Sequence, residues 1–237
     1  MLKDWSPEQV SGHLKREPQT SLSHQRSYQH SYADQAAGGN LHHSLRCQKK
    51  RRKRYGAYDR RGHIPQCVSS AERPKVIATR RRIGEWEADT IIGQHHHQAI
   101  VSLVERKSRL TLLKKVERHP AAAVEEAISQ LLRPVVAQVR TITSDTGREF
   151  ANHQALARQL QATFYCAHPY ASWERGTNEN TNGLVRQYFP KKSDFSKIDD
   201  AELARVMEGL NTRPRKTLGF RTPQQVFFKH QSVALRC

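Results

Sequence analysis

Long apolar runs and closely spaced Cys-x-x-Cys motifs are missing from this sequence, and each absence excludes some classes of protein. No stretch of about 18 or more apolar residues occurs and no signal-peptide pattern opens the chain, so we expect neither membrane insertion nor secretion. The four cysteines are scattered without a Cys-x-x-Cys pair, which argues against both a zinc ribbon and a disulfide framework. We therefore expect free thiols and a cytoplasmic location.

Acidic residues are also scarce, because 22 Asp and Glu stand against 40 Lys and Arg and leave a formal net charge of +18. Residues 1 to 82 hold 18 of the basic and 6 of the acidic residues, so the excess is concentrated there. The chain has 237 residues, 36% of them hydrophobic, enough for one domain with a core and a smaller module. Such a charge balance favours a polyanionic partner.

A run of six consecutive cations is the strongest basic feature: Lys49, Lys50, Arg51, Arg52, Lys53 and Arg54. These side chains repel one another, and a phosphate backbone would relieve that repulsion as its counterions are released. The alternative is a solvated basic linker with no dedicated role. Since the whole N-terminal third is basic, we predict contact with nucleic acid.

The chain before this run carries only weak helical signals. Ser6, Pro7 and Gln9 supply a cap, a proline at the first helical position and a capping-box partner, which predict a short helix. Ser23 to Tyr32 has two tyrosines on one face but serine and arginine where a packed helix needs apolar groups, so we do not expect it to form a packed helix.

From Arg82 onward the hydrophobic pattern becomes regular. Alternation predicts strands at 83–92, 98–105, 109–116, 139–144 and 163–167, the first three as an antiparallel meander. Helical periodicity predicts helices at 120–132 and 148–160, and a further helical face follows Glu179. This order predicts an α/β fold of the ribonuclease H type, with a mixed five-stranded sheet and helices on both faces.

Two acidic residues are expected at the sheet. Glu85, Glu87 and Asp89 alternate along the first strand and share a face, so only one of them needs to reach a site, and Asp89 lies deepest in the run. Asp145 ends the fourth strand, where open α/β sheets present their ligand crevices. Glu149 is a weaker candidate because its spacing from Thr146 fits a capping box.

A third acidic residue, Glu179, heads a polar stripe in which Asn182, Gly183 and Arg186 follow at helical spacing. The alternative for this stripe is a merely solvated helix face. Three carboxylates from two strands and a helix would supply the hard oxygen ligands that Mg²⁺ prefers, with Mn²⁺ as a substitute. Two such ions activate an attacking oxygen and stabilise a leaving one at a phosphodiester. The pattern therefore predicts a metal-dependent enzyme acting on nucleic acid.

Five segments in register resemble the DDE transposases of the insertion-sequence-thirty family. They are Arg82-Ile83-Gly84-Glu85-Trp86-Glu87-Ala88-Asp89-Thr90, Val104-Glu105-Arg106-Lys107-Ser108-Arg109, Ser144-Asp145-Thr146-Gly147-Arg148-Glu149-Phe150, His168 to Asn180, and Leu210 to Lys216. The resemblance implies an integrase-like catalytic core in which Asp89, Asp145 and Glu179 form the metal-binding triad, with 33 residues between the last two. It also places Asn182 and Arg186 near DNA phosphates.

The activity implied is metal-dependent hydrolysis at the ends of a mobile element, followed by transfer of the freed 3′-hydroxyl into target DNA. The implied partners are the terminal inverted repeats, the target DNA and further copies of the chain, in the nucleoid of a bacterial cell. We expect residues 1–45 to be the remnant of a helical DNA-binding region, 46–81 a basic linker and 82–232 the catalytic domain.

Two departures from the family pattern leave alternatives open. Thr146 stands where the family usually has Asn, and we expect the helix-turn-helix region to be shorter than is usual in the family. One alternative is a truncated, transposition-deficient copy that binds DNA and interferes with full-length relatives. A second is a generic ribonuclease H-like nuclease.

Overall fold

The computed structural model describes residues 5–16, 22–45, 64, 66–94, 98–118, 120–168 and 172–229. Contacts divide the chain into two compact units. One unit comprises residues 1–59 with 211–237, and the other comprises residues 60–210. The basic run at 49–54 lies outside the described residues, so its contact with DNA stays a prediction. None of the described helices has the length and apolar character needed to cross a membrane.

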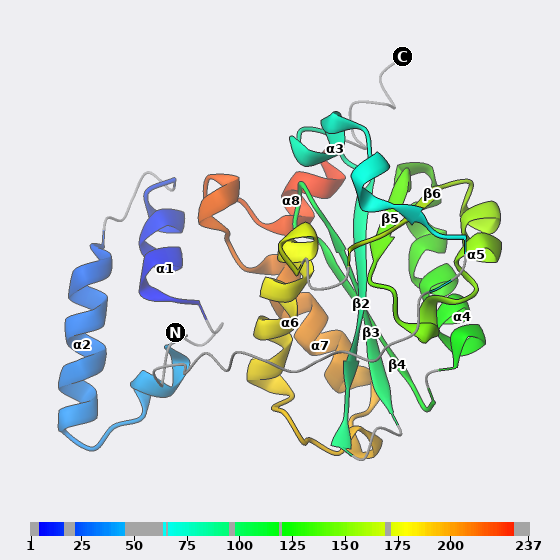
Figure 1. Cartoon of the computed structure of the whole chain (residues 1–237). Coiled ribbons are helices and arrows are strands. Elements are labelled where there is room, and N and C mark those ends of the chain that lie inside the picture. Colours follow the sequence, from blue (N-terminus) through cyan, green and yellow to red (C-terminus); the bar gives the residue numbers. More distant parts are fainter. Residues whose placement is uncertain are drawn as a thin grey trace. The chain divides into compact units, whose positions relative to one another are not determined.

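The larger unit is built on a six-stranded mixed sheet (Figure 1). Its strands lie in the order β1-β6-β5-β2-β3-β4. The bounds are β1 Val68–Ser69, β2 Glu85–Ile92, β3 Ala99–Glu105, β4 Thr111–Val116, β5 Thr141–Ser144 and β6 Thr163–Cys166. The pairs β2–β3 and β3–β4 are antiparallel, whereas β2–β5, β5–β6 and β1–β6 are parallel. The predicted mixed sheet and antiparallel meander are confirmed.

The predicted count of five strands is one short. The additional strand, β1, has only two residues and pairs with the edge of the sheet at β6. A strand of this length carries no alternation, so no sequence pattern indicates it. It lies within 46–81, the range expected to be a linker.

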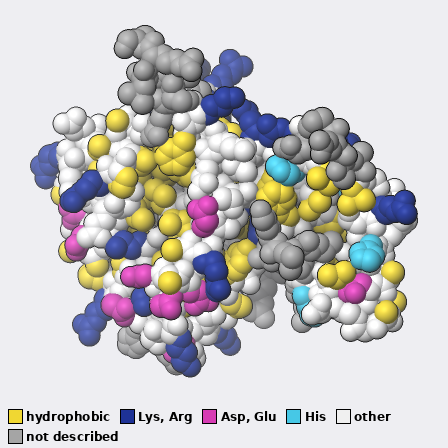
Figure 2. All heavy atoms as spheres, turned by 180° about the vertical axis from the view of Figure 1, so that it is seen from behind, with side chains coloured by type: hydrophobic (Ala, Val, Ile, Leu, Met, Phe, Trp, Pro, Cys, Tyr) yellow, Lys and Arg dark blue, Asp and Glu magenta, His cyan; other side chains and the backbone are white. Residues whose placement is uncertain are grey.

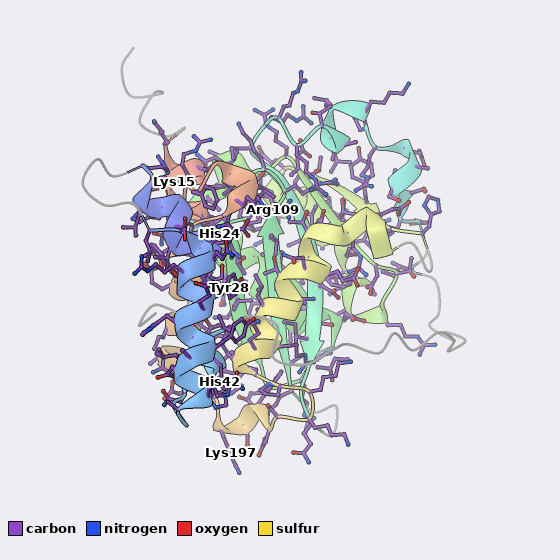
Figure 3. All side chains as sticks on the ribbon, turned by 90° about the vertical axis from the view of Figure 1, so that its left-hand side faces the viewer. Lys15, His24, Tyr28, His42, Arg109 and Lys197 are labelled. Atoms are coloured by element: carbon purple, nitrogen blue, oxygen red, sulfur yellow. A yellow bond between two sulfur atoms is a disulfide. The ribbon has the colours of Figure 1, made fainter. Side chains whose placement is uncertain are left out.

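Helices cover both faces of the sheet. On one face lie α6 Gly176–Tyr188 and α7 Asp200–Thr212, and on the other lie α4 Ala121–Leu132 and α5 His153–Leu160 (Figures 1 and 3). A short α3 spans Lys75–Ala78, and the 3-10 turns of this unit are η2 Ser70–Glu72, η4 Arg133–Gln138, η5 Arg148–Phe150, η6 Ser172–Arg175 and η7 Phe195–Lys197.

The core on the α6 face is apolar and continuous. Ile91, Ile100 and Leu113 project from three neighbouring strands onto Leu184 and Val185 of α6, with residues of α7 completing the cluster. Since side chains alternate along a strand, Asp89 shares the face of Ile91 and points toward α6. The same alternation places Thr90 toward the α4 and α5 side.

The turn between β3 and β4 is organised around Glu105. This buried carboxylate accepts hydrogen bonds from the backbone N–H groups of Gly84, Lys107 and Ser108 and from the Ser108 hydroxyl. Burial raises the pKa of Glu105, and the hydrogen bonds to Ser108, Lys107 and Gly84 oppose that rise. Within the segment Val104 to Arg109, Glu105 and Ser108 are therefore explained by their hydrogen bonds in the turn.

The smaller unit contains α1 Pro7–Leu14, α2 His24–Ala36, η1 Leu41–Ser44, η8 Lys216–Leu218 and α8 Pro223–Phe228. Ser6 and Gln9 form the predicted capping box of α1. Gln9 Nε2 also donates to the carbonyl oxygen of Pro214 at 2.9 Å. Against expectation, the second segment is helical over 13 residues, capped by Ser23, with His24 and Tyr28 projecting from it (Figure 3).

Candidate active site

Asp89 and Asp145 are brought to neighbouring strands by the sheet register. In the parallel pair β2–β5, Glu87 stands opposite Thr143, so positions 89 and 145 follow at the same level. Asp89 lies inside β2 and Asp145 follows the last residue of β5. The two aspartates are thus adjacent at the carboxyl end of β5, as the sequence pattern indicates for Asp145.

A single guanidinium connects the two carboxylates. Arg175 Nη1 lies 3.2 Å from Asp89 Oδ2, and Arg175 Nη2 lies 3.4 Å from Asp145 Oδ2. The side chains of Asp89, Asp145 and Arg175 are 23%, 21% and 15% exposed. The site is therefore a pair of half-buried acids that converge on one cation. Arg175 is not among the site residues predicted from the sequence, although it lies in one of the matching segments.

Asp89 is held by one ion pair and two hydrogen bonds. Besides Arg175, the backbone N–H of Thr90 donates to its Oδ1 at 2.9 Å, and Asn182 Nδ2 donates to its Oδ2 at 3.0 Å. Even so, burial raises the pKa of Asp89 to about 6. Arg175 opposes this rise, and the negative charges of Asp145 and Glu149 add to it. The environment thus lacks enough positive charge to keep the pKa of Asp89 at its ordinary value.

Asp145 begins a tight turn. Its Oδ1 accepts a hydrogen bond from the backbone N–H of Gly147 at 3.0 Å. A Cβ at position 147 would lie 2.9 Å from that same Oδ1 and 2.4 Å from Glu149 Oε2. A side chain at position 147 would therefore force the Glu149 and Asp145 carboxylates to shift.

The proposed capping role of Glu149 is wrong. The helix expected at 148–160 is split into η5 Arg148–Phe150 and α5 His153–Leu160, and η5 begins without a side-chain cap. Glu149 Oε1 instead accepts a hydrogen bond from the Thr90 hydroxyl at 3.0 Å, next to Asp89. A local spacing rule cannot detect this contact because its partner lies on β2.

Helix α6 is fixed to the sheet by a buried polar network. The backbone N–H of Asn178 donates to Glu87 Oε2 at 2.8 Å, and Arg106 Nε lies 3.3 Å from Glu87 Oε1. Ser102 Oγ donates to Asn178 Oδ1 at 3.1 Å and to Asn182 Oδ1 at 2.9 Å. Glu87 and Asn178 are fully buried. Glu87 is therefore committed to positioning α6, and Glu85 is likewise buried against Arg82 and Thr141.

Glu179 is exposed on α6. It stands four residues after Arg175 and three before Asn182, and both of those residues contact Asp89. This spacing puts Glu179 on the side of the helix that borders the aspartates. Among the described residues, no group of three or more His, Cys, Asp or Glu side chains is assembled closely enough to hold a metal ion. The three-acid site accordingly remains a prediction.

Arg186, predicted to contact DNA, lies two turns further along α6. Its Nη2 donates to the carbonyl oxygen of Ile92 at 2.8 Å, and its guanidinium carbon lies 5.8 Å from the centre of the Phe195 ring. These contacts hold the end of β2 to α6. Asn182, the other residue predicted near phosphates, is turned toward Asp89. Contact of either residue with DNA stays a prediction.

The donor set fits a hard divalent cation. Asp89 Oδ2 and Asp145 Oδ2 converge on a cationic group, and like charge together with burial already destabilises the ionised form of Asp89. Carboxylate oxygens are the ligands that Mg²⁺ and Mn²⁺ prefer. Histidine and cysteine are not needed for such a site.

Two cysteines expected to be free thiols are joined. Cys67, just before β1, forms a disulfide with Cys166 at the end of β6, across 99 residues of sequence. The strand pair β1–β6 brings Val68 opposite Tyr165 and Ser69 opposite Cys166. The free-thiol prediction failed for this pair because only the unexpected strand β1 places the two cysteines together.

The fold defines the class of protein. The catalytic core of bovine immunodeficiency virus integrase superposes with a TM-score of 0.50 at 21% identity, covering 64% of this chain and 98% of that one. A simian T-cell lymphotropic virus intasome in complex with a PP2A regulatory subunit also gives a TM-score of 0.50, at 19% identity. The larger unit thus has the ribonuclease H-like fold of integrase catalytic cores. No protein-family profile matches the chain.

Similarity to curated proteins is more specific. The chain is 41% identical over 228 residues to the transposase of insertion sequence IS4351 from Bacteroides fragilis, covering 96% of this chain and 70% of that protein. It is 40% identical over 232 residues to the IS1086 transposase of Cupriavidus metallidurans, covering 94% and 68%. Escherichia coli InsI of IS30A is 36% identical, with 98% and 62% covered. The chain therefore belongs to the IS30 family of transposases.

Proposed function

We propose that this chain is a DDE transposase whose Asp89, Asp145 and Glu179 hold two divalent metal ions. The observation that carries the proposal is the convergence of Asp89 and Asp145 on one cation at the carboxyl end of β5. When bound, the ions supply charge stabilisation at a phosphodiester and lower the pKa of an attacking hydroxyl or water. Mg²⁺ is the proposed ion, and Mn²⁺ is the substitute.

Each protein group has a role that its contacts support. Asp89 and Asp145 offer carboxylate oxygens, and Asn182 orients Asp89 through the hydrogen bond to its Oδ2. Glu179 offers a third carboxylate from the exposed side of α6, between two residues that contact Asp89. The buried contact of Asn178 with Glu87 keeps α6 in register with β2, so that these groups stay together.

The proposed reaction has two steps at phosphorus. A water oxygen attacks the phosphodiester at the element's end and loses a proton to solvent, the bond to the 3′-oxygen breaks, and that oxygen takes a proton from solvent to become a 3′-hydroxyl. That hydroxyl then attacks a phosphodiester of target DNA and loses its proton to solvent, and the displaced 3′-oxygen takes up a proton. No covalent bond to the protein forms. Because two ends must be joined, we propose an oligomer of the chain on DNA.

A strand-transfer assay with the element's terminal repeats and Mg²⁺ or Mn²⁺ tests the function. We expect Asp89→Ala, Asp145→Ala and Glu179→Gln each to lower cleavage and joining by at least about a hundredfold, since each removes a ligand of a two-ion site. Glu149→Gln is the matched control. Glu149 accepts a hydrogen bond from the Thr90 hydroxyl beside the site and is not among the proposed ligands. The variant should retain most of the activity.

The assay also separates the alternatives. Specific binding to the repeats without cleavage would support a transposition-deficient copy that interferes with full-length relatives. Cleavage without joining would support a generic nuclease of the same fold. If Glu179→Gln kept full activity and Glu149→Gln lost its activity, the third metal ligand would be Glu149 of η5, and the proposed triad would be wrong.

A further inference from the structure

Arg175 occupies the place between the two aspartates. Its two terminal nitrogens each face a different carboxylate, at 3.2 Å and 3.4 Å, and its side chain is 15% exposed. A guanidinium in this position balances two negative charges that would otherwise repel each other in a half-buried setting. The same carboxylates are proposed to bind divalent ions, so one set of oxygens serves two competing cations.

The segment that carries Arg175 is anchored without it. Ser70 Oγ donates to Glu174 Oε2 at 2.6 Å, and Glu174 also accepts from the backbone N–H of His168 at 2.9 Å. On the other side, the backbone N–H of Asn178 is bound to buried Glu87. Both neighbours of the arginine in η6 and α6 therefore stay in place if its side chain moves.

The guanidinium itself is incompletely satisfied. Its Nε atom is buried and has no hydrogen-bond partner within the part of the chain that the structure describes. A buried donor without a partner destabilises the arrangement in which it is held. Arg175 is thus held mainly by two ion pairs, both to groups that a divalent ion would attract more strongly.

We propose that Arg175 is an internal counter-cation that holds Asp89 and Asp145 together before metal binding and releases at least one of them when the ion binds. The inference rests on the proposed function and adds a positioning residue to it. Arg175 lowers the apparent affinity for the metal, because binding must first break its ion pairs. In return, Arg175 reduces the repulsion between the Asp89 and Asp145 carboxylates while the site holds no ion.

Calorimetric titration of the metal alone tests this inference without DNA or catalysis. We expect Arg175→Gln to raise the association constant for Mn²⁺ about tenfold, within the range of typical coupling between sites. Arg175→Lys keeps the charge but cannot contact both carboxylates as a planar fork, so its increase should be smaller. Arg158→Gln, which removes an exposed charge on α5, is the matched control and should leave the affinity unchanged.

Thermal unfolding supplies a second measurement. Without metal, Arg175→Gln should melt below the unsubstituted chain, and saturating Mn²⁺ should narrow that gap. Equal or weaker Mn²⁺ affinity in both Arg175 variants would overturn the inference while leaving the metal site intact. Loss of all Mn²⁺ binding in the unsubstituted chain and in every variant would overturn the proposed function and this inference with it.

Discussion

Acidic residues in one sheet take different roles according to their partners. Glu105 is enclosed by four donors from its own turn and Gly84, and Glu87 is paired with Arg106 and the first turn of α6. Asp89 keeps 23% of its side chain exposed and carries a pKa raised to about 6. Partial exposure and a raised pKa, which distinguish Asp89 from the buried Glu87, mark it as the carboxylate available to a ligand.

The free energy of unfolding should depend on pH because the ionised form of Asp89 is unfavourable in the folded protein. The pKa of Asp89 rises from 3.8 to about 6 on folding, so the folded state binds the proton more tightly. The stability that protonated Asp89 contributes is complete below pH 3.8 and is lost as pH rises through about 6. In metal-free protein, Asp89→Asn should therefore raise the free energy of unfolding, by up to about 3 kcal/mol above pH 6 and by little near pH 4.

Urea unfolding at a series of pH values measures this difference. Mn²⁺ provides the internal control, because it should stabilise the unsubstituted chain and not the Asn variant. A constant difference across the series, or a variant that is less stable at neutral pH, would contradict the assignment of Asp89 as a strained acid.

At the scale of elements, the short strand β1 has effects beyond its length. It extends the sheet at β6. Because β1 pairs there, Ser70, which follows it, donates a hydrogen bond to Glu174, and Cys67, which precedes it, lies beside Cys166. The residues after β6 lead to η6, which presents Arg175 to the aspartates. A two-residue strand at the edge of the sheet thus supports the segment that completes the site.

Reduction of the Cys67–Cys166 disulfide should lower the stability of the larger unit. A bridge across 99 residues restricts the unfolded chain, and its removal should decrease the free energy of unfolding by about 2–4 kcal/mol. Denaturant unfolding with and without a thiol reductant measures the change. Cys67→Ser should respond to reductant far less, and an equal response in that variant would assign the effect to Cys47 or Cys237.

At the scale of the whole molecule, charge is distributed unevenly along the sequence. On the face shown in Figure 2, Asp and Glu side chains lie among the Lys and Arg side chains of the described residues. Residues 83 to 237 hold 22 Lys and Arg against 16 Asp and Glu, whereas the first 82 residues hold 18 against 6. The N-terminal third therefore provides most of the long-range attraction for a polyanion.

Salt dependence of DNA binding tests the basic run. Neutralising residues 49–54 with Gln should flatten the slope of log affinity against log salt by about 0.9 for each phosphate contact that is lost. Binding measured at several salt concentrations gives that slope. An unchanged slope would assign the run to a solvated linker and leave DNA contact to residues outside 49–54.

Local sequence patterns alone determined the strands from β2 to β6, helix α4, the capping box of α1 and the family, because alternation, helical spacing and short motifs depend on neighbouring residues. Tertiary structure decided which acidic residue of β2 stays exposed, where Glu149 points, which cysteines pair and what cation lies between the aspartates. Each of these depends on contacts between residues distant in sequence: Arg175 reaches Asp89 across 86 positions. Burial and pairing at that range are set by how strands and helices pack.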